Sequence, residues 1–166
     1  MSELLQLTFW ATFLSAAVRT AIPILCASIG EDISEKAGII NVGLEAVMLV
    51  GAFFGFAAAY LTRSLFWGFV VGMLAGMLLS LLHAFLSVYL KQDQNVAGVA
   101  LNLLATGLTS YIFQLMVNRY GIPQIETLKS VPIPLLSKIP LIGDALFNKD
   151  IVVYFSYLLV VFLVFY

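Results

Sequence analysis

Five long apolar stretches, separated by charged and turn-forming residues, constrain this 166-residue chain more than any other feature. The first four are each long enough for a helix that crosses about 30 Å of hydrocarbon, which takes about 20 residues. Backbone groups find no water in lipid, so such stretches must be helical. We expect the fifth to be a helix that the end of the chain truncates. The stretches are Leu4–Ile29, Ala37–Leu61, Ser64–Leu90, Val96–Asn118 and Ile151–Tyr166.

The composition excludes a soluble enzyme. Hydrophobic residues make up 62% of the chain and charged residues 10%, against roughly 25% charged residues in an ordinary soluble domain. The formal net charge of -1 gives no electrostatic reason to expect nucleic acid. One cysteine, Cys26, and one histidine, His83, are too few for an internal disulfide or a metal site. The sequence predicts an all-α membrane protein, a polytopic transmembrane helix bundle with four complete spans and a truncated fifth.

A proline-rich loop is expected between the fourth and fifth stretches, at about residues 119–150. This segment contains four of the five prolines, and proline at that density prevents a long regular helix. A loop of this length is usually functional or disordered. Its apolar runs predict that it packs on the membrane face of the protein, where it could cap a cavity.

Small residues recur at every fourth position of two stretches. Helices associate in lipid mainly by close packing, and small residues let two backbones approach each other. We therefore interpret these rows as helix-packing faces with a structural role. The rows include Gly51 and Gly55 in the second stretch and Gly68, Gly72 and Gly76 in the third.

The fourth stretch contains a polar row at the same spacing. Amides and hydroxyls are costly against lipid, so this row must face protein or water. Two interpretations remain open from the spacing: interhelical hydrogen bonds, or the wall of a polar path for hydroxylated solutes. The candidates for such a path are Asn102, Thr106, Ser110 and Gln114, together with Asn41 in the second stretch.

Two charged residues, Arg19 and Glu45, lie inside the four complete stretches. Each costs about 2.5–3.5 kcal/mol at a helix centre on insertion scales. If Gly30–Lys36 is a simple turn, the two lie at similar depths, and we hypothesise an intramembrane ion pair; the alternative is that each reaches water separately. Pro23 cannot donate to the carbonyl of Arg19, so we expect a kink or break in the first helix there.

His83 and Ser87 stand four residues apart, as a crude base and nucleophile would. No oxyanion donor or third group is visible in the sequence, so a packed or hydrogen-bonded histidine is favoured and an intramembrane hydrolase is the weakest hypothesis. The sequence also contains no P-loop motif. We therefore expect no cofactor in this chain, with any ATP and Mg²⁺ bound by a separate subunit.

Three blocks of the sequence are distinctive: the segment from Ala21 to Ala52, the segment from Gln94 to Thr109, and the segment from Ile133 to Gly143. Together they resemble the permeases of bacterial ABC importers in the branched-chain amino acid and simple-sugar superfamily, and most closely its nucleoside (simple-sugar) branch. Ala46 and Lys36 depart from the family pattern, where glycine and arginine are usual, and such permeases are roughly twice as long.

This resemblance implies that residues 1–166 are the N-terminal part of one transmembrane permease domain in the bacterial cytoplasmic membrane. It implies a channel-forming subunit that is not itself an enzyme, a partner ABC ATPase, a second permease subunit in a heterodimer, and a substrate-binding lipoprotein. These partners would act with the surrounding membrane lipid and without nucleic acid. The implied activity is nucleoside import by alternating access. The alternatives are a simple-sugar permease of the ribose type, a membrane scaffold that transports nothing, or a truncated fragment.

Overall fold

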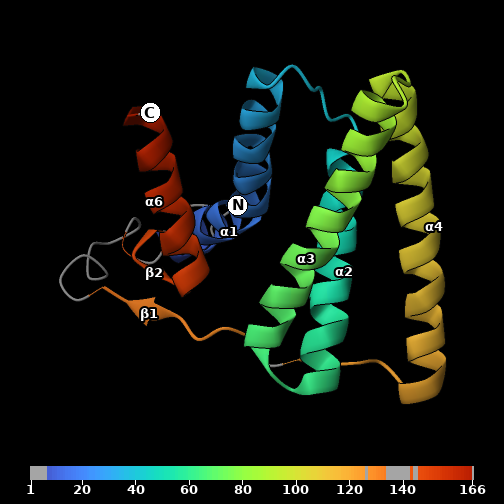
Figure 1. Ribbon diagram of the computed structural model, residues 1–166. Coiled ribbons are helices and arrows are strands. Elements are labelled where there is room, and N and C mark those ends of the chain that lie inside the picture. Colours follow the sequence, from blue (N-terminus) through green and yellow to red (C-terminus); the bar gives the residue numbers. More distant parts are fainter. Residues whose placement is uncertain (1–6, 126, 134–142, 144–145, 166) are drawn as a thin grey trace. The chain divides into compact units, whose positions relative to one another are not determined.

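The computed structural model describes residues 7–125, 127–133, 143 and 146–165, which are mainly helical (Figure 1). Four of the described helices are long and apolar enough to cross a membrane, and a shorter apolar helix follows them. This confirms the expected all-α polytopic bundle. The helices are α1 (Leu7–Lys36), α2 (Leu44–Thr62), α3 (Leu65–Ala84), the π-helical turn η2 (Phe85–Tyr89), α4 (Gln94–Tyr120) and α6 (Ile151–Phe165), and the short strands are β1 (Val131–Pro132) and β2 (Asn148–Lys149).

The chain divides into two compact units, and each is described by itself. The first combines Met1–Ile29 with Thr127–Tyr166, and the second is Gly30–Glu126. The boundary falls within α1, so this helix contributes to both units. The glycine rows and the polar row of α4 belong to the second unit.

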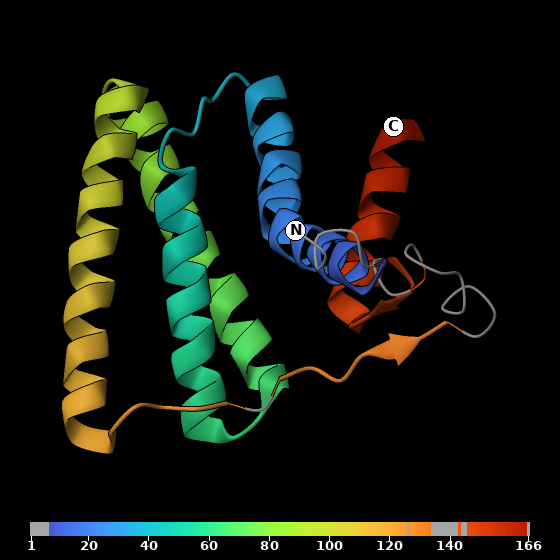
Figure 2. The same ribbon diagram turned by 180° about the vertical axis from the view of Figure 1, so that it is seen from behind.

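In the second unit, α2 lies between α3 and α4, as both ribbon views show (Figures 1 and 2). Arg63 adopts a left-handed conformation at the end of α2 (φ 52°) and reverses the chain directly into α3. Glycines then let the α2 and α3 backbones approach closely. A Cβ atom on Gly72 would lie 2.9 Å from the carbonyl oxygen of Gly51, and one on Gly55 would lie 3.0 Å from that of Gly68.

The apolar core of the second unit is a cluster of four buried residues where α2 meets α4. Side chains of Phe54, Ala75 and Leu79 pack against this cluster. The helix α4 begins after Asp93, its N-cap residue. The Asp93 carboxylate accepts hydrogen bonds from the backbone N–H groups of Asn95 and Val96, as is usual for an aspartate at this position. The buried cluster consists of Ala46, Val50, Leu101 and Ala105.

The expected turn at Gly30–Lys36 is wrong, because this segment is the last part of α1. The helix also runs unbroken through Pro23, so no break is found there, while both ribbon views show α1 bent between its two ends, in agreement with the expected kink (Figures 1 and 2). An exposed Lys36–Asp32 ion pair (3.1 Å), four residues apart, supports this last turn. The depth argument for an Arg19–Glu45 pair therefore loses its premise. The second apolar stretch becomes helical seven residues later than expected, at residue 44.

In the first unit, Tyr154 of α6 joins the two short strands to the helix. Its hydroxyl lies 2.9 Å from the carbonyl oxygen of Val131 and 2.8 Å from that of Phe147, and it accepts a hydrogen bond from the backbone N–H of Lys149 (3.2 Å). The strands pair antiparallel, with Val131 opposite Lys149. The loop expected at 119–150 thus includes ordered strands, whereas most of its apolar runs lie outside the described residues.

We expect Tyr154→Phe to destabilise this connection, because it removes a hydroxyl that contacts three backbone groups. The loss should be about 1–3 kcal/mol of unfolding free energy, measured as a lower midpoint in thermal unfolding and faster tryptic cleavage at the exposed Lys129. Tyr157→Phe is the matched control, because the buried hydroxyl of Tyr157 has no hydrogen-bond partner among the described residues. Equal destabilisation by both variants would contradict the prediction.

Candidate functional site

A non-helical segment, residues 37–43, joins α1 to α2 and borders the first turns of α4. Its backbone is bonded by side chains from other elements. The N–H of Ile40 donates to Gln94 Oε1 (2.8 Å), and the N–H of Asn41 donates to Glu31 Oε1 (2.7 Å). Non-helical backbone is tolerated at membrane depth only where protein groups or water satisfy it. Amide and carboxylate side chains provide this here.

Asn102 of α4 completes the support of this segment. Its Nδ2 donates to the carbonyl oxygen of Val42 (3.2 Å), and its Oδ1 accepts from the backbone N–H of Ala46 (2.8 Å). One amide thus bonds the end of the segment and the first turn of α2, where helical N–H groups lack helical partners. Ala46, which stands where the resembling family has glycine, is buried in the core cluster.

The segment passes so close to α4 that no side chain fits between the two backbones. A Cβ atom on Gly98 would lie 2.7 Å from the backbone N of Gly43 and 2.9 Å from the carbonyl carbon of Val42. Gly98 and Asn102 stand four residues apart on α4, so one face of this helix makes both the close approach and the hydrogen bonds.

Two buried side-chain oxygens lie beside this segment. Glu31 Oε2 and Asn41 Oδ1 are buried and accept no hydrogen bond within the described part of the chain. Glu31 accepts the backbone N–H of Asn41 through its other oxygen, Oε1, so the two residues are in direct contact. Buried acceptors without partners are costly, and a solute hydroxyl or amine would satisfy them.

The path candidates on α4 take different positions. Asn102 is half-buried and makes the interhelical hydrogen bonds described above, whereas Thr106 donates to the carbonyl oxygen of Asn102 on its own helix (2.8 Å). Ser110 and Gln114 are exposed. The face of α4 that packs in the unit is the neighbouring row of Leu101, Ala105 and Thr109, all buried. The exposed polar row thus lies beside the packed face.

The proposed ion pair joins residues from the two units. Arg19 lies in the first unit and Glu45 in the second, and both are exposed. Glu45 stands in the first turn of α2, where a carboxylate is stabilised by the positive end of the helix dipole. This position gives the charge a role independent of Arg19. The pair stays a prediction.

His83 is packed inside the second unit. It is 2% exposed, and its Nε2 lies 3.4 Å from Ser87 Oγ, while its Nδ1 has no hydrogen-bond partner among the described residues. The part of the chain that the structure describes also contains no group of three His, Cys, Asp or Glu side chains that could hold a metal ion.

Sequence reasoning missed one buried charged residue. Lys149, at the end of β2, is 1% exposed, and its Nζ donates to the carbonyl oxygen (3.0 Å) and the hydroxyl of Ser15 in α1. These contacts lie within the first unit. A lysine next to an aspartate in a proline-rich loop gives no sequence signal of burial, because its partner is 134 residues away.

Comparison with known proteins gives one family over nearly the whole chain. The family model described as "Branched-chain amino acid transport system / permease component" matches residues 13–166. No solved structure matches the chain.

Three curated relatives are similar to this chain. Over 158 residues it is 40% identical to a Haloferax volcanii protein provisionally named as a glucose ABC transporter permease (93% of this chain, 47% of the relative). Identity is 33% over 176 residues to a Bacillus subtilis guanosine ABC transporter permease (98% and 51%). It is 38% over 133 residues to a Lactococcus lactis nucleoside ABC transporter permease (76% and 42%). The chain spans about half the length of these relatives.

Proposed function

The chain belongs to the family of permease components of branched-chain amino acid transport systems, and from this premise we propose that it forms part of the membrane path of an ATP-driven nucleoside importer. The family match over residues 13–166 carries the proposal. Two of the matched relatives are named as guanosine or nucleoside permeases. The chain is a multi-pass membrane protein with four helices long enough to span, and we place it in the cytoplasmic membrane.

The proposal requires partners. The sequence contains no P-loop motif, so the energy of ATP hydrolysis has to come from a separate ATPase subunit. The chain spans about half the length of each relative, and we propose that further permease helices take part in the path. A second permease subunit and a substrate-binding lipoprotein complete the assembly that we propose.

The polar groups of the second unit suit a hydroxylated solute. A ribose ring offers hydroxyl donors, and Glu31 Oε2 and Asn41 Oδ1 are buried acceptors that no described group satisfies. Ser110 and Gln114 on α4 offer exposed groups that both donate and accept. In an alternating-access cycle, weak contacts of this kind let a polar solute pass without being held.

A simple sugar is the second candidate substrate. The relative provisionally named for glucose is 40% identical over 158 residues, and hydroxyl-rich sugars suit the same acceptors as ribose does. The two candidates differ in the base, which a sugar permease would not need to accommodate.

Uptake of labelled guanosine and uridine, in cells with the gene intact or disrupted, tests the proposal. We expect gene-dependent uptake of both nucleosides that excess ribose or glucose does not reduce. Uptake of labelled glucose or ribose that depends on the gene, with no nucleoside uptake, would move the substrate to sugars. No gene-dependent uptake of any of the four would reject both candidate substrates and leave another solute, a scaffold or an inactive fragment.

A further inference from the structure

We propose that the end of the second unit at the α2–α3 turn binds one anionic phospholipid, with its headgroup beside Arg63 and one acyl chain in the groove between α2 and α3. The two parts of this site are a polar pocket and an apolar groove that share lining residues. The inference does not rest on the transport activity, because it concerns the outer surface of a membrane-spanning unit.

The polar pocket has a volume of about 350 Å³ and lies where α2 turns into α3. Its polar lining side chains are Tyr60, Arg63, Ser64 and Gln124. Each of these side chains can donate a hydrogen bond, and Arg63 adds a permanent positive charge. No carboxylate forms an ion pair with Arg63 among the residues that the structure describes.

The start of α3 adds further donors at the same place. Ser64 occupies the N-cap position of α3, but its hydroxyl makes no capping hydrogen bond. The first N–H groups of a helix have no partner within the helix, and its N-terminus carries a partial positive charge. A guanidinium, a free hydroxyl and a helix N-terminus in one pocket form a site whose chemistry favours a phosphate group.

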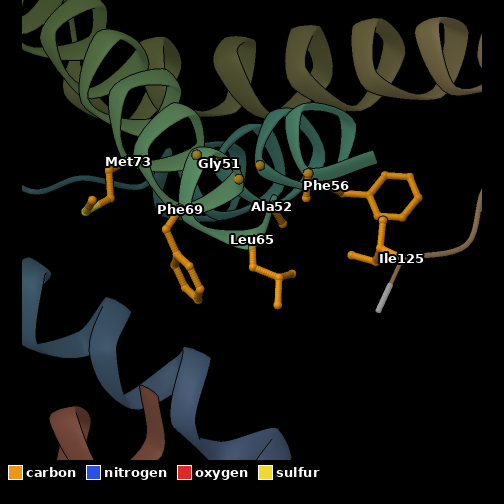
Figure 3. A pocket seen from close by; sticks show the side chains of 11 residues that line it. Gly51, Ala52, Phe56, Leu65, Phe69, Met73 and Ile125 are labelled. Carbon is orange, nitrogen blue, oxygen red and sulfur yellow. The ribbon is translucent and has the colours of Figure 1, made fainter. Parts of the chain in front are cut away.

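The apolar groove is continuous with this pocket. It has a volume of about 370 Å³ and shares Ala59, Leu65 and Ile125 with the polar pocket. Figure 3 shows Leu65, Phe69 and Met73 of α3 along one side. Glycines of the α2–α3 contact contribute to the rest of the lining and leave room between the side chains.

The length of the groove matches one half of a bilayer. From Leu65 to Met73 it follows α3 over eight helical steps, which is about 12 Å at 1.5 Å per residue. One leaflet contributes about 15 Å of a hydrocarbon core of about 30 Å. A single acyl chain that starts at the polar pocket therefore runs along the groove within its own leaflet.

The polar pocket lies at the depth expected for lipid headgroups. It lies at the ends of membrane-spanning helices, and nearby Tyr60 and Tyr120 stack edge to face with their ring centroids 6.2 Å apart. Tyrosine and arginine concentrate at such boundaries. The second arginine here, Arg119, lies over the ring of Tyr120 and does not line the pocket. Charge complementarity therefore favours an anionic lipid over an apolar helix as the occupant.

Native mass spectrometry of the purified chain, mixed with phosphatidylglycerol or phosphatidylcholine, tests the site. We expect one tightly retained phosphatidylglycerol and weaker retention of phosphatidylcholine. Arg63→Gln should weaken phosphatidylglycerol binding about tenfold, because it removes one charge-assisted contact. Arg63→Lys should bind with intermediate affinity, since it keeps the charge and loses the planar fork.

Arg119→Gln is the matched control, because it removes the same charge at the same end of the unit but outside the pocket lining. We expect it to bind phosphatidylglycerol as the unchanged protein does, and circular dichroism verifies that each variant is folded. Equal loss in the two glutamine variants, or equal binding of the two lipids, would overturn the proposal. So would a lipid-free dimer, which would assign the groove to a second copy of the chain.

Discussion

Gly98→Ala is expected to remove most of the folded protein from the membrane, whereas Gly107→Ala on the same helix should leave its abundance unchanged. The added methyl group at residue 98 would lie 2.7 Å from the backbone N of Gly43 and 2.9 Å from the carbonyl carbon of Val42. Backbone atoms cannot rotate away as a side chain can, so segment 37–43 has to move off α4. The hydrogen bonds that this segment makes with Asn102 and Gln94 would then be lost as well.

The expected cost is at the upper end of the range for overpacked cores, about 3 kcal/mol or more. Gly107 has nothing within 4 Å of an added Cβ atom, and alanine is the better helix former by about 1 kcal/mol. The measurement is membrane abundance by immunoblot, with thermal stability in detergent. Similar abundance of the two variants would show that the backbones are further apart than described.

The second large effect is expected from two substitutions on α4, one at a residue that supports the fold and one at a residue proposed to line the transport path. Asn102→Leu removes two hydrogen bonds and leaves the carbonyl of Val42 and the N–H of Ala46 without their partner. Each unsatisfied group costs about 1–3 kcal/mol, so abundance and uptake should fall together. Gln114→Leu changes an exposed amide on the same helix that no described contact requires. Its abundance should hold while its uptake falls.

The quantity to compare is nucleoside uptake divided by the amount of permease in the membrane. Asn102→Leu should change this ratio little, and Gln114→Leu should lower it several-fold. Normal uptake by Gln114→Leu would show that the C-terminal end of the polar row on α4 does not line the proposed path. Normal abundance of Asn102→Leu would show that the two hydrogen bonds are dispensable.

Hydropathy predicted most of the helices, because length and apolar content decide which segments can span a membrane. It misplaced the start of α2, since residues 37–43 include Ala37, Ile39, Ile40 and Val42 and are as apolar as a helix. Part of the reason that they are not helical is local, because Gly38 adopts a left-handed conformation (φ 83°) of the kind that ends a helix. The rest is tertiary: side chains of Gln94 and Asn102, more than 50 positions away, bond the backbone of the segment, and no local pattern contains these partners.

The candidate site was also predictable only in part, because some of its residues are brought together by contacts between distant parts of the chain. The spacing selected Asn102, with Asn41 as a further candidate, and the structure brings Asn102 against Val42, the residue that follows Asn41. It could not select Glu31, because this residue was assigned to a turn outside the membrane. Tyr154 escaped notice because its role depends on the pairing of β1 with β2, and two-residue strands have no periodicity to detect.

Segment 37–43 depends on hydrogen bonds with α4, so it can reach its final conformation only after α4 has been synthesised. The three hydrogen bonds between α4 side chains and the backbone of this region join residues 54, 56 and 60 positions apart in the chain. At about 5–20 residues per second, a ribosome needs about 3–12 s to synthesise that distance. Until then the segment lacks these bonds and has to stay hydrated at the membrane surface or inside the insertion machinery. The α1–α2 junction therefore reaches its final state only after α4 has entered the membrane.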